Sequence, residues 1–75
     1  MTTRMWEVRV VPDHAADLVA WLLSHAPASA QIYRSIDERV VVIDPSGQGV
    51  PDPPAEWVAR PPHTWDFEPV PRDTA

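Results

Sequence analysis

Hydrophobic residues follow a two-residue period at the start of the chain. Positions 6, 8 and 10 are apolar, whereas the intervening positions 7 and 9 carry charges. This alternation predicts a strand over residues 5–11 with one apolar face. Pro12 is expected to end the strand, because proline has no amide hydrogen to donate to a sheet.

The period then changes to that of a helix. Apolar residues recur three and four positions apart from Ala15 to Ala26, which predicts an amphipathic helix with one apolar stripe. Asp13 is expected to cap its N-terminus by accepting amide hydrogen bonds of the first turn. Pro27 is expected to end it, because the residue before a proline disfavours helical angles.

Two further strands are predicted, over residues 30–36 and 40–43, joined by a polar connection at 37–39. The second of these strands consists of four β-branched apolar residues, so we expect both of its faces to be covered. A single helix covers only one face of a small sheet. The pattern therefore requires a second cover for the other face.

The second half of the chain is irregular and rich in proline. Residues 45–54 contain both glycines and are predicted to form a loop, followed by a short helical turn and a C-terminal strand or arm over 55–70. A frayed tail is expected at 71–75. The length of 75 residues predicts one domain, 1–75, with its core in 5–44.

The predicted order of elements is the β-α-β-β(-α-β) order of ferredoxin-like domains. The segments at 6–11, 32–36 and 40–43 resemble the dimeric α+β barrel group, which includes the antibiotic biosynthesis monooxygenase-like proteins. The resemblance covers roughly residues 5–44. It implies an α+β, ferredoxin-like fold with an antiparallel sheet, one main helix and a homodimer whose sheets pack face to face. The segment around Trp57 departs from this pattern, because it is too short for the usual second helix. Asparagine, which helps to bind substrate in some of these monooxygenases, is absent here, so no catalytic residue is transferred.

Charge and composition exclude several classes of partner. The net charge is −5, lysine is absent and the six arginines are scattered, which argues against binding to nucleic acid or to anionic membranes. Cysteine is absent, so disulfides and thiolate metal sites are excluded. No apolar run approaches the length of a membrane span and no secretory signal is recognised, so a cytoplasmic protein is expected. The absence of lysine beside abundant Ala, Pro, Asp and Arg indicates the codon usage of a GC-rich bacterial genome, so a bacterial source is expected.

No motif predicts catalysis, a metal or a cofactor. His14 and His25 lie on one flank of the predicted helix but about 16 Å apart along its axis, too far to share one metal ion. No Ser-His-Asp set, phosphate-binding glycine loop or pair of catalytic carboxylates is recognised. The predicted site therefore contains no catalytic and no metal-binding residue.

Four residues are candidates for contact with a small ligand. Arg34 is expected on the apolar side of its strand, where it needs a carboxylate such as Glu7 or an anionic ligand. His63 lies beside an aromatic residue and is either a general base or only a turn residue. The candidate ligand-binding set is Tyr33, Arg34, His63 and Trp65.

Tryptophan is abundant for so short a chain, and it serves either to fill a small core or to form an interface. Trp21, on the helix flank, is the candidate for an exposed contact. The candidate interface set is Trp6, Trp21, Val41 and Ile43.

Two functions are consistent with these patterns. The first is a non-enzymatic homodimer that acts as an interaction or accessory module, with a further protein partner possible. The second is a small-molecule-binding or cofactor-independent monooxygenase-like protein with a cavity between helix and sheet. An acidic protein that binds a basic partner is a third hypothesis, ranked last because the carboxylates are scattered.

Overall fold

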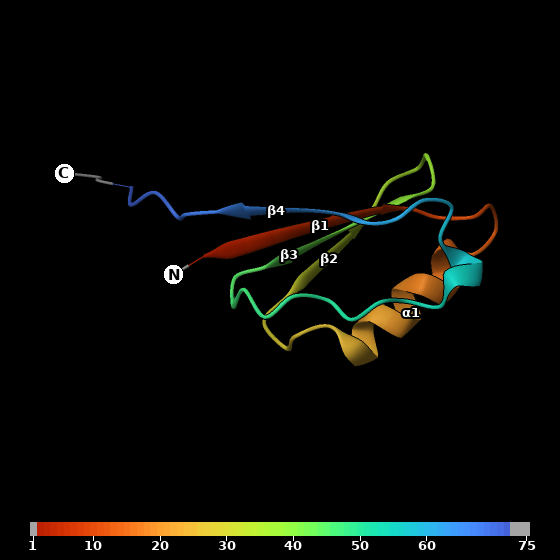
Figure 1. Ribbon diagram of the computed structural model, residues 1–75, viewed down its shortest axis with the longest axis horizontal. Helices are drawn as coiled ribbons and strands as arrows, with labels where there is room; N and C mark the ends of the chain where they lie inside the picture. The colour runs from red at the N-terminus through yellow and green to blue at the C-terminus, as the bar shows by residue number, and fades with distance from the viewer. Residues whose placement is uncertain (1, 73–75) are drawn as a thin grey trace.

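Four strands form one antiparallel sheet in the computed structural model, which describes residues 2–72 (Figure 1). The strands lie in the order β2-β3-β1-β4, so the central pair is β3 and β1. The predicted α+β class, with an antiparallel sheet and one main helix, is confirmed. The strand bounds are β1 (Thr3–Arg9), β2 (Gln31–Arg34), β3 (Arg39–Asp44) and β4 (His63–Phe67).

The helix α1 (Ala15–His25) packs on one side of this sheet. Its apolar stripe buries Ala15, Leu18 and Leu22, as the helical period predicts. The predicted cap is wrong, because His14 occupies the N-cap position and makes no capping bond through its side chain. Asp13 instead adopts a positive φ of 72° in the turn that leads from β1 into α1.

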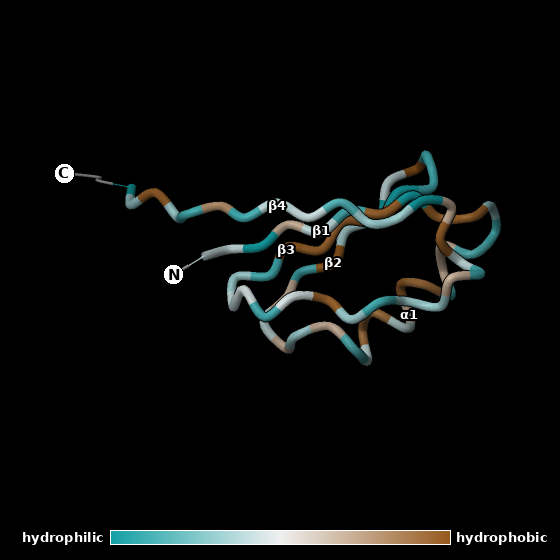
Figure 2. Tube along the Cα trace, in the orientation of Figure 1, coloured by the Kyte–Doolittle hydropathy of each residue, from teal (hydrophilic) through white to brown (hydrophobic). Residues whose placement is uncertain are grey.

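The core lies between α1 and the sheet. Trp6 and Val8 of β1 and Val40 and Val42 of β3 alternate along their strands, point toward the helix and have almost no exposed surface. Figure 2 shows hydrophobic residues concentrated in β3 and α1. The buried apolar residues are Trp6, Val8, Val10, Ala15, Leu18, Leu22, Val40 and Val42.

The proline-rich segment folds onto the same side of the sheet as α1 (Figure 1). Val50, Trp57 and Val58 pack against the core, and Trp57 lies in the short 3-10 helix η1 (Ala55–Trp57). The amide of Ala59 donates a 2.9 Å hydrogen bond to the carbonyl of Arg9, which aligns the chain for β4. The second half therefore reinforces the side that the helix already covers.

The opposite face of the sheet has no covering segment within residues 2–72. The prediction that both faces of the strand at 40–43 are covered is therefore not met within one subunit. Val40 and Val42 are buried under α1, whereas Val41 and Ile43 lie on the uncovered face and are only half-buried. The predicted tail at 71–75 is exposed at 71–72, and 73–75 lie outside the described residues.

α1 has 11 residues, and within the described chain no helix has the length and apolar character needed to cross a bilayer.

Candidate functional site

The uncovered side of the sheet, called the open face below, is the candidate surface that draws residues from all four strands. Strand register and the alternation of side chains assign twelve residues to it. Six of them are apolar or aromatic and come from all four strands, so the apolar surface is continuous across the sheet. The twelve are Thr3, Met5, Glu7, Arg9, Gln31, Tyr33, Arg39, Val41, Ile43, His63, Trp65 and Phe67.

The aromatic side chains of the open face are unusually exposed. The exposed fractions are 55% for Tyr33, 43% for Trp65 and 51% for Phe67. Met5 pairs across the strands with Ile43 on one side and with Trp65 on the other, which joins β3, β1 and β4 in one apolar row. Contiguous apolar surface of this kind marks sites of interaction in monomeric structures.

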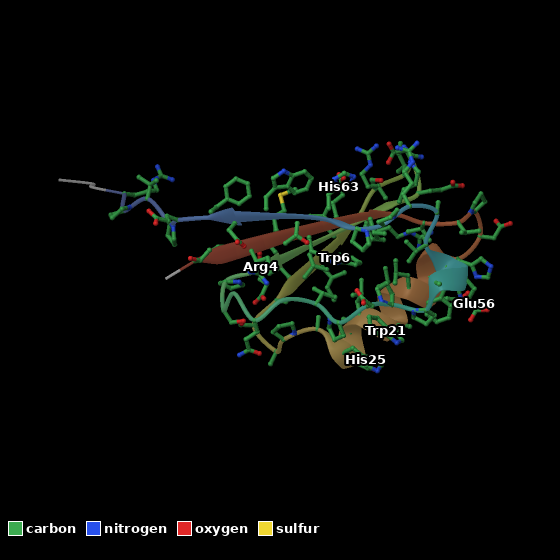
Figure 3. All side chains as sticks on the ribbon, viewed as in Figure 1. Arg4, Trp6, Trp21, His25, Glu56 and His63 are labelled. Carbon is green, nitrogen blue, oxygen red and sulfur yellow. The ribbon has the colours of Figure 1, made fainter. Side chains whose placement is uncertain are left out.

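His63 and Trp65 contact each other on this face. Their rings stack with centroids 5.7 Å apart and an interplanar angle of 14°. Figure 3 shows His63 on the side of the sheet away from α1, whereas Trp6 points toward α1. His63 pairs in register with Glu7, whose carboxylate lies 3.7 Å from the guanidinium of Arg39.

The geometry does not give His63 a carboxylate in a catalytic arrangement. As the alternation predicts, Asp66 projects to the other face of β4, where its Oδ1 accepts a 2.8 Å hydrogen bond from Nε of Arg4. Within residues 2–72 no group of three or more histidines and carboxylates is placed to hold a metal ion.

The four candidate ligand-binding residues do not converge. Tyr33 and Arg34 are neighbours on β2 and therefore project from opposite faces of the sheet. Tyr33 shares the open face with His63 and Trp65, but β3 and β1 separate it from them by about 14 Å. The predicted Arg34–Glu7 pair is wrong, because Glu7 lies on the open face with Arg39.

Arg34 instead lines an open hollow of about 400 Å³ near the start of α1, together with Ala15, Ser35, Ile36 and Glu38. A second open hollow of about 430 Å³ lies among the prolines around η1. The space between α1 and the sheet is occupied by core side chains. The cavity that a monooxygenase-like mechanism requires there is therefore filled.

The candidate interface residues divide between the two sides of the sheet. Val41 and Ile43 lie on the open face. Trp6 is only 4% exposed and belongs to the core of its own subunit. Trp21 is half-buried against the core and stacks on His25 at 4.3 Å, while Nδ1 of His25 donates a 2.8 Å hydrogen bond to the Trp21 carbonyl.

Met5 and Phe67 were missing from the predicted interface set. The signal for Met5 was present in the alternation of β1, which places residues 3, 5, 7 and 9 opposite the core residues. Glu7 and Arg9 make that face look polar in the sequence. Only the register, which sets Met5 between Ile43 and Trp65, reveals the apolar row.

A buried carboxylate stabilises the loop that leaves β3. Asp44 has no exposed surface, and Oδ2 accepts a 2.7 Å hydrogen bond from the amide of Gly49. Oδ1 accepts hydrogen bonds from the amide and the hydroxyl of Ser46, at 3.0 and 2.5 Å. Burial raises the pKa of Asp44, but these hydrogen bonds outweigh it, and the resulting pKa is lower than the usual 3.8. This arrangement is structural, because the hydrogen bonds of the carboxylate all come from its own loop.

Comparisons with protein-family models, with curated proteins and with solved structures each gave no match. The function is therefore argued from the open face and its surroundings.

Proposed function

We propose that this protein is a homodimeric interaction module in which the open face of one copy packs against the open face of a second copy. The observation that carries the proposal is the row of apolar and aromatic side chains on a sheet face that no described segment covers. Packing two such faces removes this surface from water, which is the main driving force for association.

The distribution of charge supports a second copy as the occupant. Two copies of a chain with net charge −5 repel each other over most of their surfaces. The open face is different, because it carries Arg9 and Arg39 against the single carboxylate of Glu7. Two copies that pack through the open face therefore do not bring an excess of carboxylates together.

We also propose that the chain is a reduced ferredoxin-like domain. In support, β3 lies between β1 and β2, which is the arrangement of a split β-α-β unit. The short η1 stands where a second helix follows β3 in that pattern. Such a domain leaves one sheet face uncovered, as sheet packing in a dimer requires.

The stacked His63–Trp65 pair supports a second candidate, a small planar ligand bound on the open face. A stacked pair of rings offers a flat surface for such a ligand. The absence of an enclosing wall makes this candidate weaker than a second copy, since small-molecule sites are usually concave.

The first experiment measures the solution mass by size exclusion with light scattering, at two protein concentrations about twentyfold apart. We expect a species of twice 8.4 kDa at the higher concentration. A mass of 8.4 kDa at both concentrations would contradict the homodimer.

Two variants locate the interface. Ile43→Glu places a carboxylate in the middle of the open face, and two-fold symmetry brings two of them into the interface. We expect the dissociation constant to rise at least about a hundredfold, because burying an unpaired charge is costly. Tyr33→Glu, at a side chain that is 55% exposed, tests the same face with less risk to the fold.

Leu23→Glu is the matched control, because Leu23 is 72% exposed on α1 and lies away from the open face. We expect this variant to dimerise like the wild type. Equal weakening by Leu23→Glu and by the two open-face variants would argue against the open face as the interface.

A further inference from the structure

β4 is an edge strand with few contacts to its own subunit. Among the described helices and strands it contacts only β1, along whose outer edge it runs (Figure 1). All five residues of β4 are exposed, and none belongs to the buried core or packs against it. Within residues 2–72 its one side-chain hydrogen bond to another element joins Asp66 to Arg4 at the surface. Strands with exposed backbone hydrogen bonds and few buried contacts open at the lowest cost in free energy.

The pairing along β1 is interrupted just before β4. Val58 pairs with Val10, and His63 pairs with Glu7. The three steps along β1 from 10 to 7 therefore correspond to five steps from 58 to 63, so two extra residues lie in the segment 59–62. This segment ends in two prolines, which have no amide hydrogen to donate to β1. β4 is thus separated from the residues that precede it.

The residues on the two sides of this interruption are anchored differently. Trp57 and Val58 pack against the core, and the amide of Ala59 donates a hydrogen bond to the carbonyl of Arg9. Beyond the prolines, β4 packs no side chain against the core. Release of β4 therefore leaves the rest of the subunit in place and frees the edge of β1 over residues 3–7.

The strand that fits the freed edge of β1 is β4 itself. On the open face Met5 pairs with Trp65, and on the other side Arg4 pairs with Asp66 in a salt bridge. The register of the two strands sets both contacts. The β4 strand of a second copy therefore reproduces them without any change in sequence or backbone.

We infer that the edge of β1 is an acceptor site for β4 of a second copy, so that two chains exchange this strand. The exchange is separate from the packing of open faces, because it uses the edge of the sheet. It keeps the β1–β4 ladder, so an exchanged dimer differs from two closed chains mainly by the cost of association. At micromolar concentration the closed chain is favoured, and a covalent link between chains accumulates the exchanged form.

The linker limits how the two copies lie. Four peptide steps join Ala59, which stays on its own β1, to His63, which pairs with the β1 of the other copy. These steps span at most about 14 Å at about 3.5 Å each. Residues 7–9 of the two β1 strands therefore approach within this distance, and the two sheets meet edge to edge.

The absence of cysteine makes disulfide trapping a specific test. Arg4→Cys and Asp66→Cys each place one thiol at a directly paired position, on the side of the sheet away from the open face. The two single-cysteine chains are mixed in equal amounts, incubated and oxidised, and mass spectrometry of the peptides identifies the disulfides. In this mixture a disulfide between positions 4 and 66 necessarily joins two chains. In the matched control Ser24→Cys, at an exposed position of α1, replaces Asp66→Cys.

We expect the disulfide between positions 4 and 66 to form at least about tenfold more than that between positions 4 and 24, because exchange holds the first pair together whereas the second meets only by collision. Far-UV circular dichroism verifies that each variant is folded. An equal yield of the two disulfides would overturn the inference.

A double variant with both cysteines in one chain tests the same pairing within the subunit. Arg4→Cys/Asp66→Cys at low concentration should close within the chain, since directly paired strand residues have the Cα separation that a disulfide requires. Closure here without a disulfide between chains in the mixture would overturn strand exchange and leave the open-face homodimer standing. Failure to close would contradict the pairing of β4 with β1 and so remove the basis of the inference.

Discussion

Asp44 shows how one residue determines a loop. It is the one charged or polar residue that is fully buried among residues 2–72, and all its carboxylate hydrogen bonds come from the turn at 46–49. Gly49 has a φ of 90°, and a Cβ there would come within 3.0 Å of the Arg4 side chain. Asp44 and Gly49 together hold the loop against the end of the sheet.

We expect Asp44→Asn to lower the free energy of unfolding by roughly 2 kcal/mol at neutral pH. The new side chain carries an NH2 group, which would face N–H or O–H groups that donate hydrogen bonds to the carboxylate in the wild type. The folded-state pKa of Asp44 lies below 3.8, so its stabilising effect is fully present above the unfolded pKa. That effect is lost as the pH falls through the lower, folded-state pKa.

The difference between wild type and Asp44→Asn should therefore shrink in acid, which urea unfolding at pH 7 and at about pH 3 measures. Asp52→Asn, at an exposed position in the same irregular segment, is the control and should change stability by less than about 0.5 kcal/mol. A difference between wild type and Asp44→Asn that is constant across pH would contradict this account.

Residue-level features were the least predictable from the sequence. Asp13 is a favourable N-cap by residue type, yet the chain uses it in a turn with positive φ and leaves His14 at the cap. The direction in which β1 must enter α1 decides this, and no local pattern encodes that direction. The composition of 44–49, rich in Asp, Ser and Gly, indicated a turn but not which side chain the turn would bury.

At the scale of elements, α1 separates buried from exposed positions within one turn. Leu22 has no exposed surface and lies in the core, whereas the adjacent Leu23 is 72% exposed. The helical period placed both residues on or beside the apolar stripe, and the packing distinguishes them.

We expect Leu22→Ala to lower the free energy of unfolding by about 3 kcal/mol, because it leaves a cavity between α1 and the sheet. Leu23→Ala should change it by less than about 0.5 kcal/mol. Chemical denaturation of both variants, followed by tryptophan fluorescence, measures the contrast. Similar losses for the two variants would show that Leu23 is buried in solution.

Helices and strands with a clear hydrophobic period were predicted well, but the pairing between strands was not. The alternation in β1 and the helical stripe at 15–26 depend on local sequence, so they locate β1 and α1 within a few residues. The pairing of β4 with β1 depends on contacts about 60 residues apart, which no local period contains. For the same reason the sequence identified Trp65, Val41 and Ile43 as interface or ligand candidates but did not join them through Met5.

At the scale of the whole molecule, folding and association are expected to be linked. A partner that binds only the folded chain stabilises it by mass action, and in the proposed homodimer the second copy is that partner. The structure buries one side of its sheet within the subunit, and the proposed dimer would bury the other side.

We expect the melting temperature to rise with protein concentration. A tenfold increase favours the folded dimer by about 0.7 kcal/mol per chain, which corresponds to about 3–6 °C for a domain of this size. Differential scanning calorimetry at two concentrations measures the shift. The Ile43→Glu variant, expected to be monomeric, should melt at one temperature regardless of concentration, and a wild-type melting temperature that is equally constant would argue against linkage.

The two faces of the sheet share strands but not side chains. In β1 and β3, successive residues alternate between the core under α1 and the open face. Substitutions at Met5, Val41 or Ile43 can therefore alter the open face while Trp6, Val40 and Val42 remain as they are. After a gene duplication, substitutions at these odd-numbered positions would change the binding surface of one copy and leave the core packing of both copies unchanged.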